Sequence, residues 1–368
     1  MLPYIRQISA CFMIALCSIG YAKDTHTNFK VDEITSFNGI PWGMAQLDDT
    51  NLLVTIKQGA LYRVNTVTGK QTPISGLPNI ANAGQGGLLD IALSPDFDET
   101  SWVYFTYSHP MADGATTALA RAKLQGSALV DWQDVFITDA GSDTGKHFGS
   151  RIAFDNDGHV FISIGDRGER ANAQDLTNHA GKILRLNLDG SVPKDNPFVR
   201  RGNVRAEIWS YGHRNPQGLY YDQHTQRLWS NEHGPRGGDE INLIRVGANY
   251  GWPIVSYGKE YWGPFQVGEG TSKEGIDEPK KVFTPSIAPG SLLVYRGQLF
   301  NGWDGDFLST ALALRHLNNV KLVNGNVSES RHLEDLDERM RDVIELSDGA
   351  LAISTDSGRI LRILPASS

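Results

Sequence analysis

Five loops, most of them rich in glycine, carry more polar side chains than turns require. They span residues 84–90, 146–151 together with 165–168, 211–218, 231–240 and 339–342. In the second loop His147 is followed, after the next apolar run, by Asp166. Histidine is the side chain best suited to proton transfer near neutral pH, and a carboxylate can orient its ring. The pair therefore indicates a general base, although a lone loop histidine is more often structural.

Arginines are the second notable feature of these loops. Arg214, Arg339 and Arg341 could each pair with an acidic side chain at the surface. If the fold brings all three together, they form a site for a polyanion, because a guanidinium binds a carboxylate through two parallel hydrogen bonds. Gln85, in the first loop, has the simpler interpretation of bracing its turn.

The fourth loop offers oxygen ligands for a metal ion. Asp239 and Glu240 follow Gly234 and Pro235. Carboxylates and backbone carbonyls without a soft ligand favour Ca²⁺ over zinc or copper. An ordinary acidic turn explains the same residues equally well. The sequence has no dinucleotide-binding glycine motif at a strand–helix junction and no Gly-x-Ser-x-Gly elbow, which argues against a Rossmann oxidoreductase and an ordinary serine hydrolase.

The segments between these loops predict strands. Short apolar or alternating runs, such as 52–56, 102–107, 159–164 and 351–355, stand between clusters of Gly, Asp, Asn and Pro. This pattern is typical of an all-β domain. A turn containing aspartate and followed by a new strand recurs around six residues: Asp49, Asp96, Asp157, Asp222, Asp304 and Asp348.

Repeating units of this size are typical of propeller blades. A second echo relates residues 55–63 to 355–362, each a strand, a tight turn and a strand with arginine at its end. We therefore expect an all-β fold, a single six-bladed β-propeller of four-stranded antiparallel blades over residues 23–368. The two ends of the chain should complete one blade together. A two-sheet sandwich is the alternative, but a chain of this length without a domain linker favours the propeller.

The first 22 residues have the pattern of a signal peptide. Arg6 precedes an apolar run over 8–19, and small residues precede Lys23. A lipid anchor at Cys17 is the alternative, but the preceding Leu16 is too bulky for the usual lipoprotein signal. We expect a protein that is periplasmic or secreted and has no stable membrane insertion.

The cysteine content and the net charge exclude several kinds of metal site and binding partner. Both cysteines, Cys11 and Cys17, lie in the expected signal peptide, so the mature chain is predicted to have neither disulfides nor cysteine-bound metals. The formal net charge is −8. An acidic protein of this kind is a poor candidate for binding nucleic acid or anionic membranes.

Taken in order, the loops resemble those of the soluble pyrroloquinoline-quinone (PQQ)-dependent aldose sugar dehydrogenases, the soluble glucose dehydrogenase-like family of six-bladed propellers. The resemblance covers nearly the whole mature chain. It is strongest over residues 84–97, 147–166, 207–218 and 229–253, and 285–289 and 339–343 extend it. It implies an enzyme that uses PQQ and Ca²⁺ to oxidise aldose sugars at the anomeric carbon to lactones, and that passes electrons to an external quinone or cytochrome.

The resemblance also implies a role for individual residues. His147 is the base that takes the proton of the anomeric hydroxyl while hydride passes to the quinone C5, Asp166 positions His147, and Arg214 together with Ca²⁺ stabilises the oxyanion that develops on the quinone. The remaining residues would contact the cofactor (Gln85, Arg214, Asn215, Tyr261, Arg339 and Arg341), hold a Ca²⁺ that bridges to it through the backbone carbonyls of Gly234 and Pro235, or form a separate structural Ca²⁺ site (Glu240 and Tyr250).

Two departures from the family pattern leave other functions open. Ala313 stands where many relatives have a lysine that contacts the cofactor, and Arg315 would share its strand face only if the strand register holds. Lys146 replaces a small polar residue, and we hypothesise that it restores the missing positive charge. The alternatives are a calcium-dependent propeller hydrolase of lactones or esters, which needs carboxylate ligands at the channel centre, and a non-catalytic sugar-binding propeller.

Overall fold

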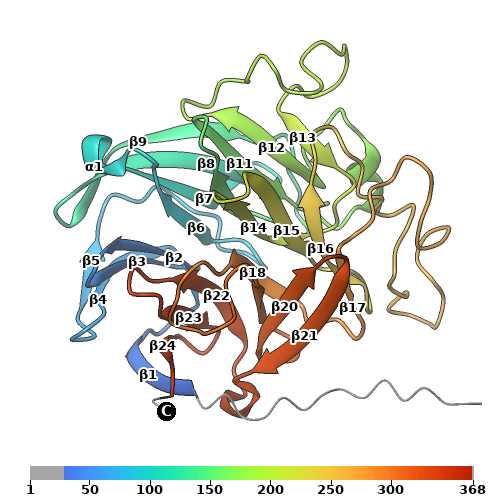
Figure 1. Cartoon of the computed structure of the whole chain (residues 1–368). Coiled ribbons are helices and arrows are strands. Elements are labelled where there is room, and N and C mark those ends of the chain that lie inside the picture. The colour runs from blue at the N-terminus through green and yellow to red at the C-terminus, as the bar shows by residue number, and fades with distance from the viewer. Residues whose placement is uncertain (1–28, 367–368) are drawn as a thin grey trace, which may run out of the picture.

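Strands joined by turns and longer loops form the described part of the chain, and the predicted six-bladed propeller is confirmed (Figure 1). The computed structural model describes residues 29–366, so the predicted signal peptide, residues 1–22, lies outside the described residues. The strands form six four-stranded antiparallel sheets, which we number as blades 1 to 6. Within residues 29–366, no helix is long and apolar enough to cross a membrane.

Each blade is built from strands that follow one another in the chain. Blade 1 contains β2 (Pro41–Asp48), β3 (Asn51–Ile56), β4 (Ala60–Asn65) and β5 (Gln71–Ile74). Blade 2 contains β6 (Leu88–Leu93), β7 (Trp102–Met111), β8 (Gly114–Gln125) and β9 (Ala128–Ile137), with the short helix α1 (Phe97–Thr100) between β6 and β7. Blade 3 contains β10 (Ile152–Phe154), β11 (His159–Ile164), β12 (Lys182–Asn187) and β13 (Ile208–Tyr211).

The second half of the chain repeats this order. Blade 4 contains β14 (Pro216–Asp222), β15 (Arg227–Glu232), β16 (Asp239–Ile244) and β17 (Lys281–Phe283). Blade 5 contains β18 (Pro289–Val294), β19 (Phe307–Ala311), β20 (Leu317–Val323) and β21 (Asn326–His332). Blade 6 contains β22 (Met340–Glu345), β23 (Leu351–Thr355), β24 (Arg359–Pro365) and β1 (Phe29–Ser36). Single-turn 3-10 helices cover Arg170–Gln174 and Glu334–Leu336.

Blade 6 joins the two ends of the described chain, as the sequence predicts. The first strand, β1, pairs antiparallel with β24, with Phe29 opposite Pro365 and Ser36 opposite Arg359 (Figure 1). This pairing closes the ring of blades between its first and last strands. Closure by hydrogen bonds between the ends stabilises a propeller that has no disulfide among its described residues.

The two ends of the propeller carry different kinds of turn. All six repeating aspartates lie in or beside the turn between the first and second strands of a blade, which confirms the predicted repeat. The polar loops instead precede first strands or join second to third strands. Because neighbouring strands are antiparallel, these loops meet at the opposite end, which we call the mouth. The echoed segments 55–63 and 355–362 are second-to-third-strand hairpins of blades 1 and 6.

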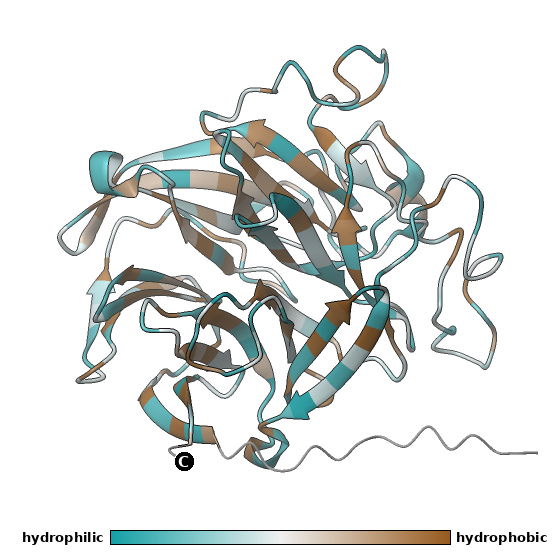
Figure 2. Cartoon of the chain, in the orientation of Figure 1, coloured by the Kyte–Doolittle hydropathy of each residue, from teal (hydrophilic) through white to brown (hydrophobic). Residues whose placement is uncertain are grey.

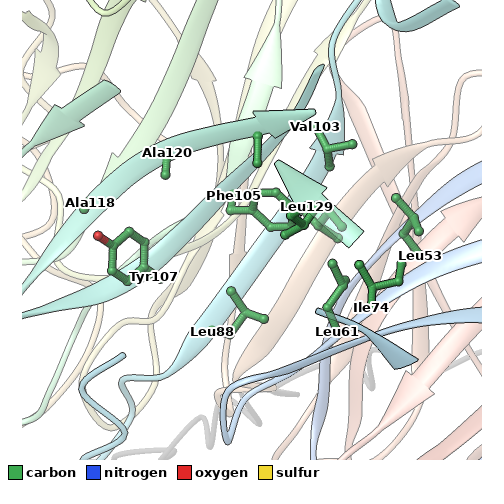
Figure 3. Packing of buried hydrophobic residues seen from close by; sticks show 12 residues of the cluster. Leu53, Leu61, Ile74, Leu88, Val103, Phe105, Tyr107, Ala118, Ala120 and Leu129 are labelled. Carbon is green, nitrogen blue, oxygen red and sulfur yellow. The ribbon is translucent and has the colours of Figure 1, made fainter. Parts of the chain in front are cut away.

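The hydrophobic core lies between neighbouring blades. Brown and teal residues alternate along many strands in Figure 2, because successive side chains point to opposite faces of a sheet. In one cluster Leu53 and Leu61 of blade 1 meet Leu88 and Phe105 of blade 2, and all four are buried (Figure 3). Each such side chain contributes roughly 1.5–3 kcal/mol on burial. Blade-to-blade packing therefore holds the mouth loops in fixed positions.

A buried arginine connects the first strands around the channel. Arg151, directly before β10, is 4% exposed. Its contacts come from the first strands of the other five blades: the Trp42 ring at 4.2 Å, Asp90 at 3.0 Å, the carbonyl oxygens of Gln217 at 2.8 Å and Gly290 at 2.7 Å, and Asp342 at 3.0 Å. The Arg151 guanidinium thus connects the six blades beneath the mouth, and we call this set of contacts the floor.

Candidate functional site

His147 and Asp166 form a hydrogen-bonded pair at the mouth. His147 Nδ1 lies 2.6 Å from Asp166 Oδ1. The Gly168 N–H donates to the same oxygen at 2.8 Å, and Trp252 Nε1 donates to Asp166 Oδ2 at 2.8 Å. Burial by itself would raise the pKa of Asp166, but the bonds from His147 and Gly168 hold this pKa below its ordinary value. The ionised carboxylate therefore keeps the proton on Nδ1 and leaves Nε2 of the imidazole as a base.

The His147 loop is fixed from three sides. His147 has φ 51°, in the left-handed region, and its N–H donates to Gln85 Oε1 at 2.8 Å. A Cβ on Gly165 would lie 2.2 Å from the His147 carbonyl oxygen, so only glycine allows this close approach. The buried Arg167 guanidinium stacks 3.6 Å from the centre of the Phe148 ring. Gln85 therefore braces the loop with its oxygen, and its amide nitrogen is the end that can contact a ligand.

Arg214 and Asn215 lie directly before β14. The Arg214 N–H donates to Glu232 Oε2 at 2.7 Å, and Nη1 donates to the Gly234 carbonyl oxygen at 2.8 Å. The guanidinium carbon of Arg214 also lies 5.3 Å from the centre of the Trp252 ring, so Arg214 and the His147–Asp166 pair share that indole as a neighbour. Asn215 Oδ1 accepts a bond from a backbone N–H of the His147 loop at 3.2 Å.

The residues predicted to bind calcium lie around one small cavity. Its volume is about 20 Å³, enough for a single water-sized sphere. Gly234, Pro235, Glu240 and Tyr250 all line it. The predicted bridging site and the predicted structural site are thus neighbours in this structure. Arg214 also lines the cavity, which connects it to the predicted cofactor contacts.

The carboxylates around this cavity would attract a cation. Glu232 also lines it, and Asn242 Nδ2 donates to Glu232 at 3.2 Å and to Glu240 at 3.1 Å. Burial and the neighbouring charge of Glu232 raise the pKa of Glu240. The Tyr250 hydroxyl donates to the Leu243 carbonyl at 2.6 Å and accepts a bond from the Arg245 N–H at 2.8 Å. Tyr250 would therefore bind a cation through its backbone carbonyl.

Side chains alone do not form a metal site here. Among residues 29–366 there is no group of three or more His, Cys, Asp or Glu placed to hold a metal ion. A cation at this cavity would therefore depend on carbonyl oxygens together with Glu240. The hydrolase alternative needs a metal held by several carboxylates at the channel centre, and the described residues do not provide one.

Arg339 and Arg341 lie on either side of one carboxylate, that of Asp356. Arg339 Nε donates to Asp356 Oδ2 at 2.9 Å, and Arg341 Nη2 lies 2.9 Å from Oδ1. Arg339 Nη1 also donates to the Leu312 carbonyl at 2.8 Å, and its side chain is half exposed, whereas Arg341 is mostly buried. Two guanidinium groups thus share one carboxylate, which leaves excess positive charge at this side of the mouth.

The two departures and Tyr261 lie in exposed positions. Tyr261 is 65% exposed on the long segment between β16 and β17. Ala313 is exposed in the turn between β19 and β20, and Lys146 is exposed next to His147. Arg315 pairs with Asp337 at 2.9 Å. Because residues 312–316 form a turn and not a strand, the shared strand face considered for Arg315 is wrong.

Four side chains that organise the site were not singled out from the sequence: Arg167, Glu232, Trp252 and Asp356. Glu232 and Trp252 lie inside the segment 229–253 that carries much of the resemblance. That segment contains many glycines and several carboxylates, so no pattern distinguishes these two residues from their neighbours. Asp356 had a usable signal. It follows the second strand in one of the two echoed hairpins, at the position that Lys57 occupies in the other.

Comparisons with known proteins match the chain over most of its length. The family model described as Glucose / Sorbosone dehydrogenase matches residues 39–362. The aldose sugar dehydrogenase YliI of Escherichia coli strain K12 is 39% identical over 365 residues, which cover 96% of this chain and 97% of that protein.

Two solved structures have the same fold. The soluble aldose sugar dehydrogenase (Asd) from Escherichia coli, in its apo-form, superimposes with a TM-score of 0.88 and 37% identity, over 92% of this chain and 99% of that one. The PQQ-bound form of an aldose sugar dehydrogenase from Streptomyces coelicolor gives a TM-score of 0.75 and 28% identity, over 92% and 99% of the two chains.

Proposed function

Because the chain belongs to the glucose/sorbosone dehydrogenase family, we propose that it oxidises aldose sugars at the anomeric carbon to lactones, with PQQ and Ca²⁺ as cofactors. The observation that carries this proposal is the His147–Asp166 pair, held at a mouth that three arginines also reach. Two homologues are aldose sugar dehydrogenases by name, and one of them binds PQQ.

The mouth fits an anionic quinone. PQQ is planar and carries several carboxylates, and carboxylates are the groups that guanidinium binds best. Arg339 and Arg341 share a single carboxylate, so they retain unused positive charge. Together with Arg214, the Gln85 amide nitrogen and Asn215, they would hold the cofactor. Tyr261, although exposed on its loop, would cover it from the side of the segment between β16 and β17.

The residues that line the cavity beside Arg214 include suitable calcium ligands. Backbone carbonyls and carboxylates are the ligands that Ca²⁺ prefers. The carbonyl oxygens of Gly234 and Pro235 would bind the ion that contacts the cofactor. Glu240, with the Tyr250 carbonyl, would bind the structural ion, and a cation there would offset the burial and the repulsion from Glu232 that raise the pKa of Glu240.

The chain's own groups then divide the work of the reaction. When bound, PQQ would supply the acceptor for the hydride of the anomeric carbon, and Ca²⁺ a Lewis acid. His147 Nε2 takes the proton of the anomeric hydroxyl, and ionised Asp166 stabilises the imidazolium that forms. Arg214 is a fixed positive charge where negative charge develops, which is the usual large electrostatic contribution to catalysis.

One reconstitution experiment tests this function. Apo-protein would be given PQQ and Ca²⁺ and then tested for dye reduction with a panel of aldoses and secondary alcohols. We expect dye reduction with aldoses that requires both cofactors. If the protein neither reduces dye nor changes the absorbance of PQQ, the dehydrogenase proposal fails. Binding of PQQ without reduction would favour the non-catalytic propeller.

We also propose the electron acceptor and the location. Electrons would leave the mouth to an external quinone or cytochrome. Export to the periplasm or the medium rests on the predicted signal peptide, residues 1–22. Mass spectrometry of the exported protein tests it, with a mature N-terminus at Lys23 as the expected result and an intact Met1 as the contradicting one.

A further inference from the structure

Lys57 occupies a position at the mouth that other blades use for site residues. It directly follows β3, in the turn between the second and third strands of blade 1. The corresponding turns carry Asp166 in blade 3, Gly234 in blade 4 and Asp356 in blade 6. Since all blades share one topology, the Lys57 side chain starts from the same end of the propeller as these three residues.

The stem of Lys57 passes over the loop that carries Gln85. The Lys57 carbonyl accepts a bond from the Leu88 N–H at 3.0 Å. A Cβ on Gly87 would lie 2.0 Å from that carbonyl oxygen and 2.8 Å from Lys57 Cγ, so any larger residue would displace the lysine. Lys57 Nζ reaches Asn82 Oδ1 at 3.4 Å. The absence of a side chain at Gly87 therefore leaves space for the Lys57 side chain to extend along the mouth.

Lys57 is also a half-buried cation without an ion-pair partner among the described residues. Burial and the charge of Arg341 lower the pKa of Lys57, while Asp356 acts in the opposite direction. Lys57 therefore lies within electrostatic range of Arg341 and Asp356. Asp356 is already bound by both Arg339 and Arg341, so the ammonium has no carboxylate of its own. A half-buried charge in this state is stabilised by an anionic ligand.

We propose that Lys57 is a further cofactor-binding residue, whose ammonium binds a carboxylate of PQQ beside Arg341 and takes over the charge of the lysine that Ala313 replaces. This inference rests on the proposed function. Lysine is a compact point charge with rotatable donors, so it can serve a carboxylate without the fixed geometry of arginine. Lys146, the other candidate for this charge, is exposed and directly precedes His147, whose N–H donates to Gln85.

Binding of PQQ to the Ca²⁺-loaded apo-protein measures the effect without turnover. Tryptophan fluorescence would be titrated with PQQ for the parent, Lys57→Met, Lys57→Gln, Lys57→Arg and Lys146→Met. Lys70→Met is the matched control, because Lys70 is exposed in the turn between β4 and β5 at the far end of the same blade. We expect Kd to rise about 10- to 100-fold in the two neutral Lys57 variants, the range for losing a bond to a charged group. Lys57→Arg and Lys70→Met should stay close to the parent.

The outcomes separate this inference from the function on which it rests. If the parent binds no PQQ, both fail. If the parent binds PQQ and oxidises aldoses but the neutral variants bind as tightly as the parent, only the role of Lys57 is refuted. Equal weakening in Lys57→Arg would also refute it, because stem packing and not charge would then be responsible. Loss of binding in Lys146→Met alone would assign the charge to Lys146. Thermal melting of the neutral variants at the parent temperature confirms that a loss is not unfolding.

Discussion

Replacing Asp166 by asparagine tests how the site sets the state of His147. The carboxylate accepts three bonds, from His147 Nδ1, the Gly168 N–H and Trp252 Nε1. Asparagine keeps the shape but has one acceptor oxygen and an NH₂ group. That NH₂ must face either the His147 or the Trp252 donor. If it faces His147, the imidazole adopts the other tautomer and its Nε2 carries the proton.

The size of this effect follows from the two consequences. A base in the wrong tautomer loses roughly 10⁴ in kcat when the same substitution is made in a serine protease triad. If the NH₂ instead faces Trp252, a buried donor is left unpaired, at a cost of about 1–3 kcal/mol of folding free energy. The pH dependence has a definite sign. Since the folded pKa of Asp166 is lowered, its contribution to stability is present above the unfolded pKa of about 3.9 and is lost as pH falls through the folded value.

The assay compares two aspartate–histidine pairs of blade 3. Asp155 Oδ2 lies 2.8 Å from His159 Nδ1 at the far end of that blade, so Asp155→Asn is the matched control. Steady-state dye reduction gives kcat, and fluorescence titration gives Kd for PQQ. We expect Asp166→Asn to lower kcat by about 10³-fold or more with little change in Kd. A kcat close to the parent value without any loss of folding free energy, or an equal loss of kcat in Asp155→Asn, would refute the positioning of His147 by Asp166.

Two further predictions concern the floor and the calcium cavity. Arg151→Met leaves Asp90 and Asp342 buried without their cation, and we expect the free energy of unfolding in urea to fall by about 3–5 kcal/mol; an unchanged urea midpoint would contradict the floor that Arg151 forms. Removing Ca²⁺ with EGTA should lower the Tm of the parent by more than that of Glu240→Gln, because the variant lacks the carboxylate that would hold the structural ion. A parent Tm that does not respond to EGTA would exclude a structural calcium at Glu240.

The fold could be predicted because its signals are local. The aspartate turns that recur six times mark the first-to-second-strand turn of every blade, and the strand pattern between them has the two-residue period of a sheet. The expectation that the ends meet in one blade is confirmed by the pairing of β1 with β24. The prediction that Arg315 could share a strand face with Ala313 is wrong for an equally local reason, because the five residues between β19 and β20 form a turn.

The site was predictable as a set of loops but not as a set of contacts. Trp252 bonds to Asp166 across 86 residues of sequence. Asp356, which follows β23, holds Arg339 and Arg341 at the start of the neighbouring strand β22, and neither Trp252 nor Asp356 has a periodic pattern. The first pair depends on which blades are neighbours, and the second depends on the register of β22 against β23 within blade 6. The sequence also does not show which polar atoms are free to bind a ligand. The Tyr250 hydroxyl, for example, already forms hydrogen bonds with the backbone of Leu243 and Arg245.

The role of His147 as the base is tested most directly by a single turnover. Parent and His147→Gln would be loaded with PQQ and Ca²⁺, mixed rapidly with an aldose, and followed by the absorbance of the bound quinone. We expect the parent to reduce its cofactor, and the variant to bind PQQ with a similar Kd but to reduce it about 10²- to 10⁴-fold more slowly. Reduction in His147→Gln at the parent rate would contradict the assignment.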